Sequence, residues 1–196
     1  VSEITGNLEI NRIPGLEVLS GLECLTGVGG SLRLSNNHAL TSLDGLNSLT
    51  SVGNDLFIQE NISLTNLDGL SSITSVEGDL VIWRNDALTN LDGLSNVASV
   101  RGSRWGLRIS SNDSLTSLDG LRGLTSVEAL SISDNVALTN LDGLSNLTAV
   151  GGLYLGGNDS LTSLDGLNGL TTVGGLSIGG NGALTSLDGL NGLTTV

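Results

Sequence analysis

One seven-residue segment, Leu-Thr-(Ser or Asn)-Leu-Asp-Gly-Leu, recurs along most of the chain and restricts it to a repeat architecture. Successive copies begin 23, 24 or 27 residues apart. A unit this short cannot bury its own apolar side chains, so its stability depends on stacking against its neighbours. The seven copies begin at Leu40, Leu64, Leu88, Leu115, Leu138, Leu161 and Leu184.

The spacing of apolar residues within one copy predicts its geometry. Leu32 and Leu34 are two residues apart, which places both side chains on one face of a β-strand. The three-residue steps from Leu40 to Leu49 fit short arcs and turns better than an amphipathic helix. We therefore expect an all-β repeat solenoid, a stack of about eight coils of 23–27 residues whose parallel strands lie about 4.8 Å apart.

The two ends of the array differ. Residues 1–28 form an atypical coil, with Ile13 where later coils have Asn, Ser20 where they have Asp, and Pro14 between them. Terminal repeats are usually atypical because one face meets water, so this coil is expected to act as an N-terminal cap. Residues 29–196 form the regular array. Because Val196 completes a consensus coil without a polar cap, we expect the array to continue or to stack beyond it.

Stacking aligns two polar columns. The asparagine amides are expected to bond turn backbone groups and one another. Aspartates about 4.8 Å apart repel by roughly 1 kcal/mol per pair in water, and we expect them to cap the N–H groups of the following turn. A row of calcium ions is the alternative, but the Gly-rich spacing of such sites is missing. The columns are Asn37, Asn61, Asn85, Asn112, Asn135, Asn158 and Asn181, and Asp44, Asp68, Asp92, Asp119, Asp142, Asp165 and Asp188.

Charge and composition exclude several classes of function. Twenty acidic residues against seven basic ones give a net charge of -13, which repels nucleic acids and anionic membranes. No apolar run approaches the roughly 18 residues of a membrane helix, so no membrane insertion is expected. One cysteine, Cys24, and one histidine, His38, do not suffice for a usual zinc site or a Cys/His nucleophile pair. We expect no enzyme activity and no cofactor.

The run GDLVIWRNDALTNLDGLSNVASV, from Gly78 to Val100, resembles the leucine-rich repeat of receptor L domains, the ligand-binding domains of the insulin and epidermal growth factor receptors. It is still more similar to the regular Leu-Thr-Ser-Leu-Asp-Gly-Leu arrays of secreted or surface proteins of bacteria and protists. The resemblance extends from Ile4 to Val196 and implies a right-handed parallel β-helix at an extracellular or cell-surface location. The disulfides of the receptor domains are missing here, so hormone-receptor activity is not implied.

Unusual residues gather in the middle of the array. Five of the seven arginines and both tryptophans lie between residues 83 and 122, around the insertion at 101–106. Exposed Arg and Trp dominate binding hot spots and suit sugars or anionic groups. Alternatively, the arginines offset the acidic column and Trp105 covers the edge of a bulge. The candidate ligand-binding residues are Arg33, Phe57, Trp83, Arg84, Arg104, Trp105 and Arg108.

Three functions follow. We expect first a secreted or cell-surface binding or adhesion module for a protein or glycan ligand on a cell or matrix surface. The second is a structural protein whose coils stack end to end into filaments. The third is ice binding through a regular threonine column, which would have to be flat and free of Asp. That column consists of Thr41, Thr65, Thr89, Thr116, Thr139, Thr162 and Thr185.

Overall fold

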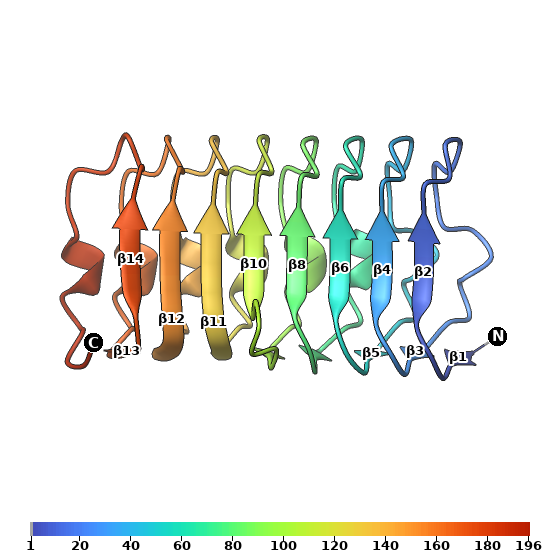
Figure 1. The fold of residues 1–196 in the computed structure, drawn as a ribbon, viewed down its shortest axis with the longest axis horizontal. Helices are drawn as coiled ribbons and strands as arrows, with labels where there is room; N and C mark the ends of the chain where they lie inside the picture. The colour runs from blue at the N-terminus through green and yellow to red at the C-terminus, as the bar shows by residue number, and fades with distance from the viewer. Residues whose placement is uncertain (1) are drawn as a thin grey trace.

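A computed structural model describes residues 2–196, so Val1, the first residue of the expected N-terminal coil, lies outside the described residues. The chain is an all-β parallel solenoid of about seven turns of about 24 residues. Its strands stand side by side along the long axis, and the two ends of the chain lie at opposite ends of the stack (Figure 1). Residues 2–196 contain no α-helix. The predicted all-β solenoid is confirmed.

The longer strands form one parallel sheet, in chain order along the axis (Figure 1). Its register pairs inward residues with inward residues, as in Leu56 with Leu80 and Leu80 with Leu107. These strands are β2 (Leu8–Asn11), β4 (Leu32–Ser35), β6 (Leu56–Gln59), β8 (Leu80–Trp83), β10 (Leu107–Ser110), β11 (Ser126–Ser133), β12 (Ala149–Gly156) and β14 (Leu176–Gly179).

A second row of short parallel strands lies at the adjoining corner, and β11 and β12 are long enough to belong to both rows. The short strands are β1 (Glu3–Ile4), β3 (Gly27–Val28), β5 (Ser51–Val52), β7 (Ser75–Val76), β9 (Ser99–Val100) and β13 (Thr172–Val173).

Behind the sheet, each Asp-Gly-Leu from the third coil onward forms a single 3-10 turn (Figure 1). The glycine is required by the stacking, because a Cβ on Gly93 would overlap the backbone carbonyl of Leu67 in the preceding coil. None of the helices in the described part of the chain is long and apolar enough to span a bilayer. The turns are η1 (Asp68–Leu70), η2 (Asp92–Leu94), η3 (Asp119–Leu121), η4 (Asp142–Leu144), η5 (Asp165–Leu167) and η6 (Asp188–Leu190).

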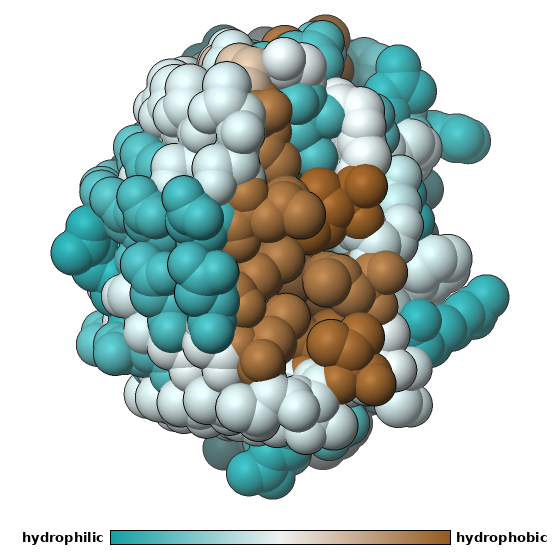
Figure 2. Space-filling model, turned by 90° about the vertical axis from the view of Figure 1, so that its left-hand side faces the viewer, coloured by the Kyte–Doolittle hydropathy of each residue, from teal (hydrophilic) through white to brown (hydrophobic). Residues whose placement is uncertain are grey.

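Columns of Leu, Ile and Val fill the interior from one coil to the next, and in the second coil all the inward positions from Leu32 to Val52 are buried. In the last coil the same columns become exposed: Leu176, Leu187 and Val196 are 36%, 55% and 72% exposed. Figure 2 views this end of the stack and shows a continuous apolar area on it. The expectation that the array continues or stacks beyond Val196 stays a prediction.

The asparagine column runs through the stack as a chain of hydrogen bonds. Asn112 shows the pattern: its Oδ1 accepts from the backbone N–H of Asn85 at 3.1 Å. Its Nδ2 donates to the carbonyl of Ile82 at 3.2 Å and to Oδ1 of Asn135 at 3.1 Å. The ladder amides from Asn37 to Asn158 are fully buried, so each coil is tied to the next by bonds that water does not reach.

The expectation that the aspartates cap the turns is wrong. The backbone N–H of Asp68 donates to Oδ1 of Asn66 at 3.1 Å, and that of Asp119 donates to Oγ of Ser117 at 3.0 Å. The side chain two residues before each Asp therefore accepts the hydrogen bond from the backbone N–H of that Asp. The carboxylates are exposed to water, where the repulsion between them is weak. In the described part of the chain, no group of three or more His, Cys, Asp or Glu side chains lies close enough to hold a metal ion.

Candidate ligand-binding face

The outward side chains of the long strands form two parallel rows along the solenoid axis, which we call the strand face. Two large side chains of the first row, Arg108 and Tyr154, lie over small residues of the second row. Nε of Arg108 donates to Oγ of Ser110 at 3.2 Å. A Cβ on Gly156 would lie 2.6 Å from the hydroxyl of Tyr154. The first row is Glu9, Arg33, Phe57, Val81, Arg108, Ser131, Tyr154 and Ser177, and the second is Asn11, Ser35, Gln59, Trp83, Ser110, Ser133, Gly156 and Gly179.

The sequence holds two tryptophans, one tyrosine and one phenylalanine, and all four border hollows on this face. Phe57, Trp83 and Trp105 surround a hollow of about 240 Å³. Val81 lines the same hollow and is only 5% exposed although it points outward, because these rings cover it. The face therefore carries an apolar cluster outside the core.

A second hollow of about 600 Å³ lies on the other side of Trp105 and extends to Tyr154 and Ser177. Its lining includes small residues such as Ser131 and Gly152. Trp105 and Arg108 border both hollows, so they form a ridge between them. Trp105 is 40% exposed and Tyr154 48%, which leaves ring surface available on both sides of the larger hollow.

Four arginines stack on the aromatic rings. The guanidinium of Arg33 lies 4.4 Å from the ring centre of Phe57, and that of Arg84 lies 5.5 Å from Trp83. Arg104 and Arg108 each lie 5.3 Å from the ring centre of Trp105. At such distances the ring quadrupole attracts the cation, which holds the guanidinium against the ring.

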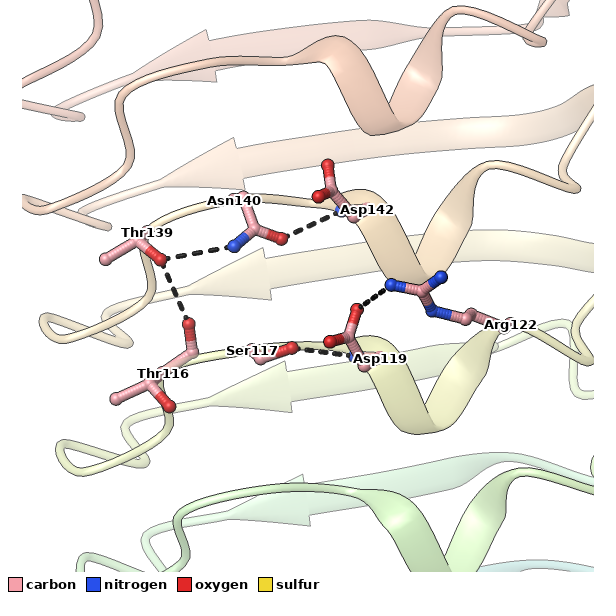
Figure 3. Close-up of polar contacts among 7 residues, drawn as sticks. All are labelled: Thr116, Ser117, Asp119, Arg122, Thr139, Asn140 and Asp142. Carbon is pink, nitrogen blue, oxygen red and sulfur yellow. Dashed lines mark hydrogen bonds and ion pairs between the residues drawn. The ribbon is translucent and has the colours of Figure 1, made fainter.

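None of these four arginines has a carboxylate partner. Within residues 2–196 the ion pairs are Arg101 with Glu77 at 3.1 Å and Arg122 with Asp119 at 2.6 Å. Hydrogen bonding to Arg122 lowers the pKa of Asp119 (Figure 3). The alternative expectation was that the arginines offset the charge of the aspartate column. Within residues 2–196, Arg122 is the arginine that forms an ion pair with that column. The positive charge of the strand face is therefore available to a ligand.

The insertion places Trp105 on the face, and a buried carboxylate holds it there. The N–H of Gly102 donates to the carbonyl of Gly78, and the carbonyl of Gly106 accepts from Leu80, so residues 103–105 are the extra ones. Oδ1 of Asp79, which is 4% exposed, accepts from the N–H groups of Trp105 at 3.1 Å and Gly106 at 3.0 Å.

Sequence reasoning missed three residues of this site: Asp79, Val81 and Tyr154. For Asp79 the sequence held a signal, since the position before the strand is polar in each of the first four coils. In the structure the backbone N–H of Asp79 donates to Oδ1 of Asp55. The structure brings together Phe57, Trp83, Arg104, Trp105 and Arg108 around the two hollows. The remaining two candidates, Arg33 and Arg84, contact this group through the rings of Phe57 and Trp83.

The threonine column lies away from this face, beside the 3-10 turns. The Thr139 hydroxyl donates to the carbonyl of Thr116 at 3.3 Å and accepts from Nδ2 of Asn140 at 3.2 Å (Figure 3). Exposed aspartates such as Asp142 stand close by in the same coils (Figure 3). The column therefore uses its hydroxyl protons to join coils and has charged neighbours, which does not favour an ice-ordering surface.

No protein-family model and no curated protein matches this chain.

Proposed function

We propose that the protein is a non-enzymatic binding or adhesion module of the secreted or cell-surface kind, and that the strand face holds its ligand. The observation that carries the proposal is the convergence of every Phe, Tyr and Trp of the sequence on two adjoining hollows, with Arg104 and Arg108 in their lining and Arg33 and Arg84 stacked on two of the rings. Trp, Tyr and Arg are the residue types that contribute most to binding energy when they are desolvated by a partner.

The scaffold beneath the face is a continuous hydrogen-bonded sheet, which favours recognition. Most of the lining lies on the strands from β6 to β12, which each pair with a strand on both sides, and the larger hollow ends on β14. A ligand that meets such a preformed surface avoids the cost of ordering loops. The larger hollow is lined by one carboxylate, Asp134, whereas hydrolysis of sugar polymers by carboxylates uses a pair, so the hollow suits binding rather than catalysis.

The resemblance to receptor L domains and to surface arrays of bacteria and protists supports the same proposal. In those proteins a repeat solenoid displays ligand-binding groups outside the cell. The finer assignment of this chain as a receptor L domain-like leucine-rich repeat at an extracellular or cell-surface location is part of the proposal.

Arrays of glycans and matrix proteins, probed with the labelled chain, test the proposal. The Trp83→Ala/Arg108→Ala double variant is expected to bind its targets at least about tenfold more weakly, about 1.4 kcal/mol, with nearly unchanged melting because both residues lie outside the core. Arg122→Gln is the matched control, since it removes a positive charge behind the sheet. A double variant that binds as well as the parent would contradict the proposal.

A second candidate, end-to-end assembly of copies into filaments, is favoured by the apolar end face of Figure 2. Leu187 and Val196 are 55% and 72% exposed there, and large exposed apolar areas favour association. Light scattering and electron microscopy over a concentration series test it. Filaments that disappear in Leu187→Lys support this candidate, and a particle that stays monomeric at high concentration counts against it.

A further inference from the structure

We infer that the ligand of the strand face is a linear anionic polysaccharide of the polyuronate type, which lies along the solenoid axis across both hollows. The inference rests on the proposed function of this face and adds the chemical class and the orientation of the ligand.

The arginines of the strand face favour an anionic ligand. The chain carries a net charge of -13, yet Arg104 and Arg108 border the hollows and Arg33 and Arg84 stack on two of the rings, and within residues 2–196 none of the four forms an ion pair. A guanidinium binds a carboxylate through two parallel hydrogen bonds. Nε of Arg108 is used by Ser110, while its terminal nitrogens remain for a ligand. The face therefore complements carboxylates that are spaced along a ligand.

The exposed aromatic rings of the strand face favour a sugar ligand. The faces of Trp and Tyr rings pack against the apolar C–H faces of sugar rings, and Trp105 and Tyr154 are 40% and 48% exposed on either side of the larger hollow. Between them lie the hydroxyl of Ser131 and the backbone of Gly152. Hydroxyl groups both donate and accept, so they match the hydroxyl groups of a sugar.

The length and direction of the two hollows favour a linear polymer. The two hollows share the ridge of Trp105 and Arg108 and together extend from Phe57 on β6 to Ser177 on β14. Five strand intervals of about 4.8 Å give a site about 24 Å long, perpendicular to the strands. One sugar unit of a linear polysaccharide has about the length of one strand interval. Successive units of such a polymer can therefore meet successive coils.

A peptide or a nucleic acid fits this face less well. A peptide that adds a strand needs a free sheet edge, and β8, β10, β11 and β12 are paired on both sides. A docked helix needs a continuous apolar groove, but in the lining of the larger hollow the charged Arg108 and Asp134 and the hydroxyl of Ser131 interrupt the apolar residues. Duplex DNA carries one charge per about 1.7 Å, which the overall negative field repels more strongly than one carboxylate per sugar.

Affinity electrophoresis and calorimetry with polygalacturonate test the inference, with its neutral methyl ester as the paired probe. We expect the polymer to bind the parent, the methyl ester to bind at least about tenfold more weakly, and the galacturonate dimer to bind more weakly still, because it spans only part of one hollow. Trp105→Ala and Arg108→Gln should each lose about tenfold or more, while Arg122→Gln should stay within about twofold of the parent.

Four results would overturn the inference. Equal binding of the methyl ester would remove the role of charge and leave a neutral glycan on the same face. If Arg122→Gln and Arg108→Gln weakened polygalacturonate binding equally, the polymer would be attracted by positive charge anywhere on the surface and not by this site. The labelled chain could also bind targets on the array through Trp83 and Arg108 and yet not bind polygalacturonate. This result would refute a polyuronate ligand but would still support the proposed function. If neither probe nor array binds, the proposed function fails as well.

Discussion

Substituting serine for Asn112 tests whether the buried amide ladder holds the coils together. Asn112 is fully buried. Its Oδ1 accepts from the backbone N–H and the side-chain amide of Asn85 at 3.1 and 3.3 Å. Its Nδ2 donates to the carbonyls of Ile82 and Ser110 and to Oδ1 of Asn135 at 3.1 to 3.2 Å. A serine hydroxyl is too short to reach the coils on both sides.

The cost follows from the groups left without partners. The buried N–H of Asn85 loses its acceptor, which costs about 1 to 3 kcal/mol. The three bonds donated by Nδ2 contribute roughly 0.5 to 1.5 kcal/mol each, and part of this remains with the hydroxyl. We therefore expect Asn112→Ser to lower the free energy of unfolding by about 3 to 5 kcal/mol. For a chain of this size each kcal/mol lowers the melting temperature by about 2 to 4 °C.

The chain offers a matched control in Asn140→Ser. Asn140 accepts from the N–H of Asp142 at 3.1 Å, and in other coils a serine makes the same bond, as Ser117 does at 3.0 Å. This variant is expected to stay within about 0.5 kcal/mol of the parent. Urea unfolding followed by circular dichroism measures both variants. If the two unfold within about 1 kcal/mol of each other, the assignment of stability to the buried ladder is wrong.

Further variants test other parts of the structure. Gly93→Ala should cost more than about 3 kcal/mol in urea unfolding because its Cβ would overlap the backbone behind it, while Gly152→Ala, which meets nothing within 4 Å, should be nearly neutral. Arg122→Gln should raise the pKa of Asp119 in an NMR titration. The small stability from this exposed pair is present above the ordinary Asp pKa of about 3.9. It is lost as the pH falls through the lowered pKa of Asp119 in the folded state, so parent and variant should converge in acid. Asp79→Ala should free the insertion, increase quenching of tryptophan fluorescence by acrylamide and weaken ligand binding, whereas unchanged quenching would contradict its anchoring role.

The regular part of the molecule was predictable because the repeat fixes the register. Once Leu32 and Leu34 are assigned inward, a parallel stack brings every inward residue onto its counterpart, and the asparagines align as a consequence. The error over the aspartates is local. An Asp before Gly suggests a cap, but here the residue two positions earlier, such as Asn66, has the geometry to accept the N–H of Asp68.

The candidate site was predictable in residue types and not in arrangement. Trp105 lies in an insertion whose path does not follow from the period. That path depends on the bonds from Trp105 and Gly106 to Asp79 in the preceding coil, a contact 26 and 27 residues away in sequence. Tyr154 was missed for a related reason, since its place beside the larger hollow follows only from the spacing of the strands.

The distribution of aromatic residues is the strongest argument that the strand face has a function beyond stability. Phe, Tyr and Trp usually contribute much of the area buried in a core. The buried core within residues 2–196 consists of Leu, Ile and Val alone. Phe57, Trp83, Trp105 and Tyr154 stand outside it, where stacking does not require them and where Ser131 and Ser177 show that small residues suffice. Since the scaffold closes without these rings, their collection beside arginines that form no ion pair within residues 2–196 supports the proposal that a ligand covers them.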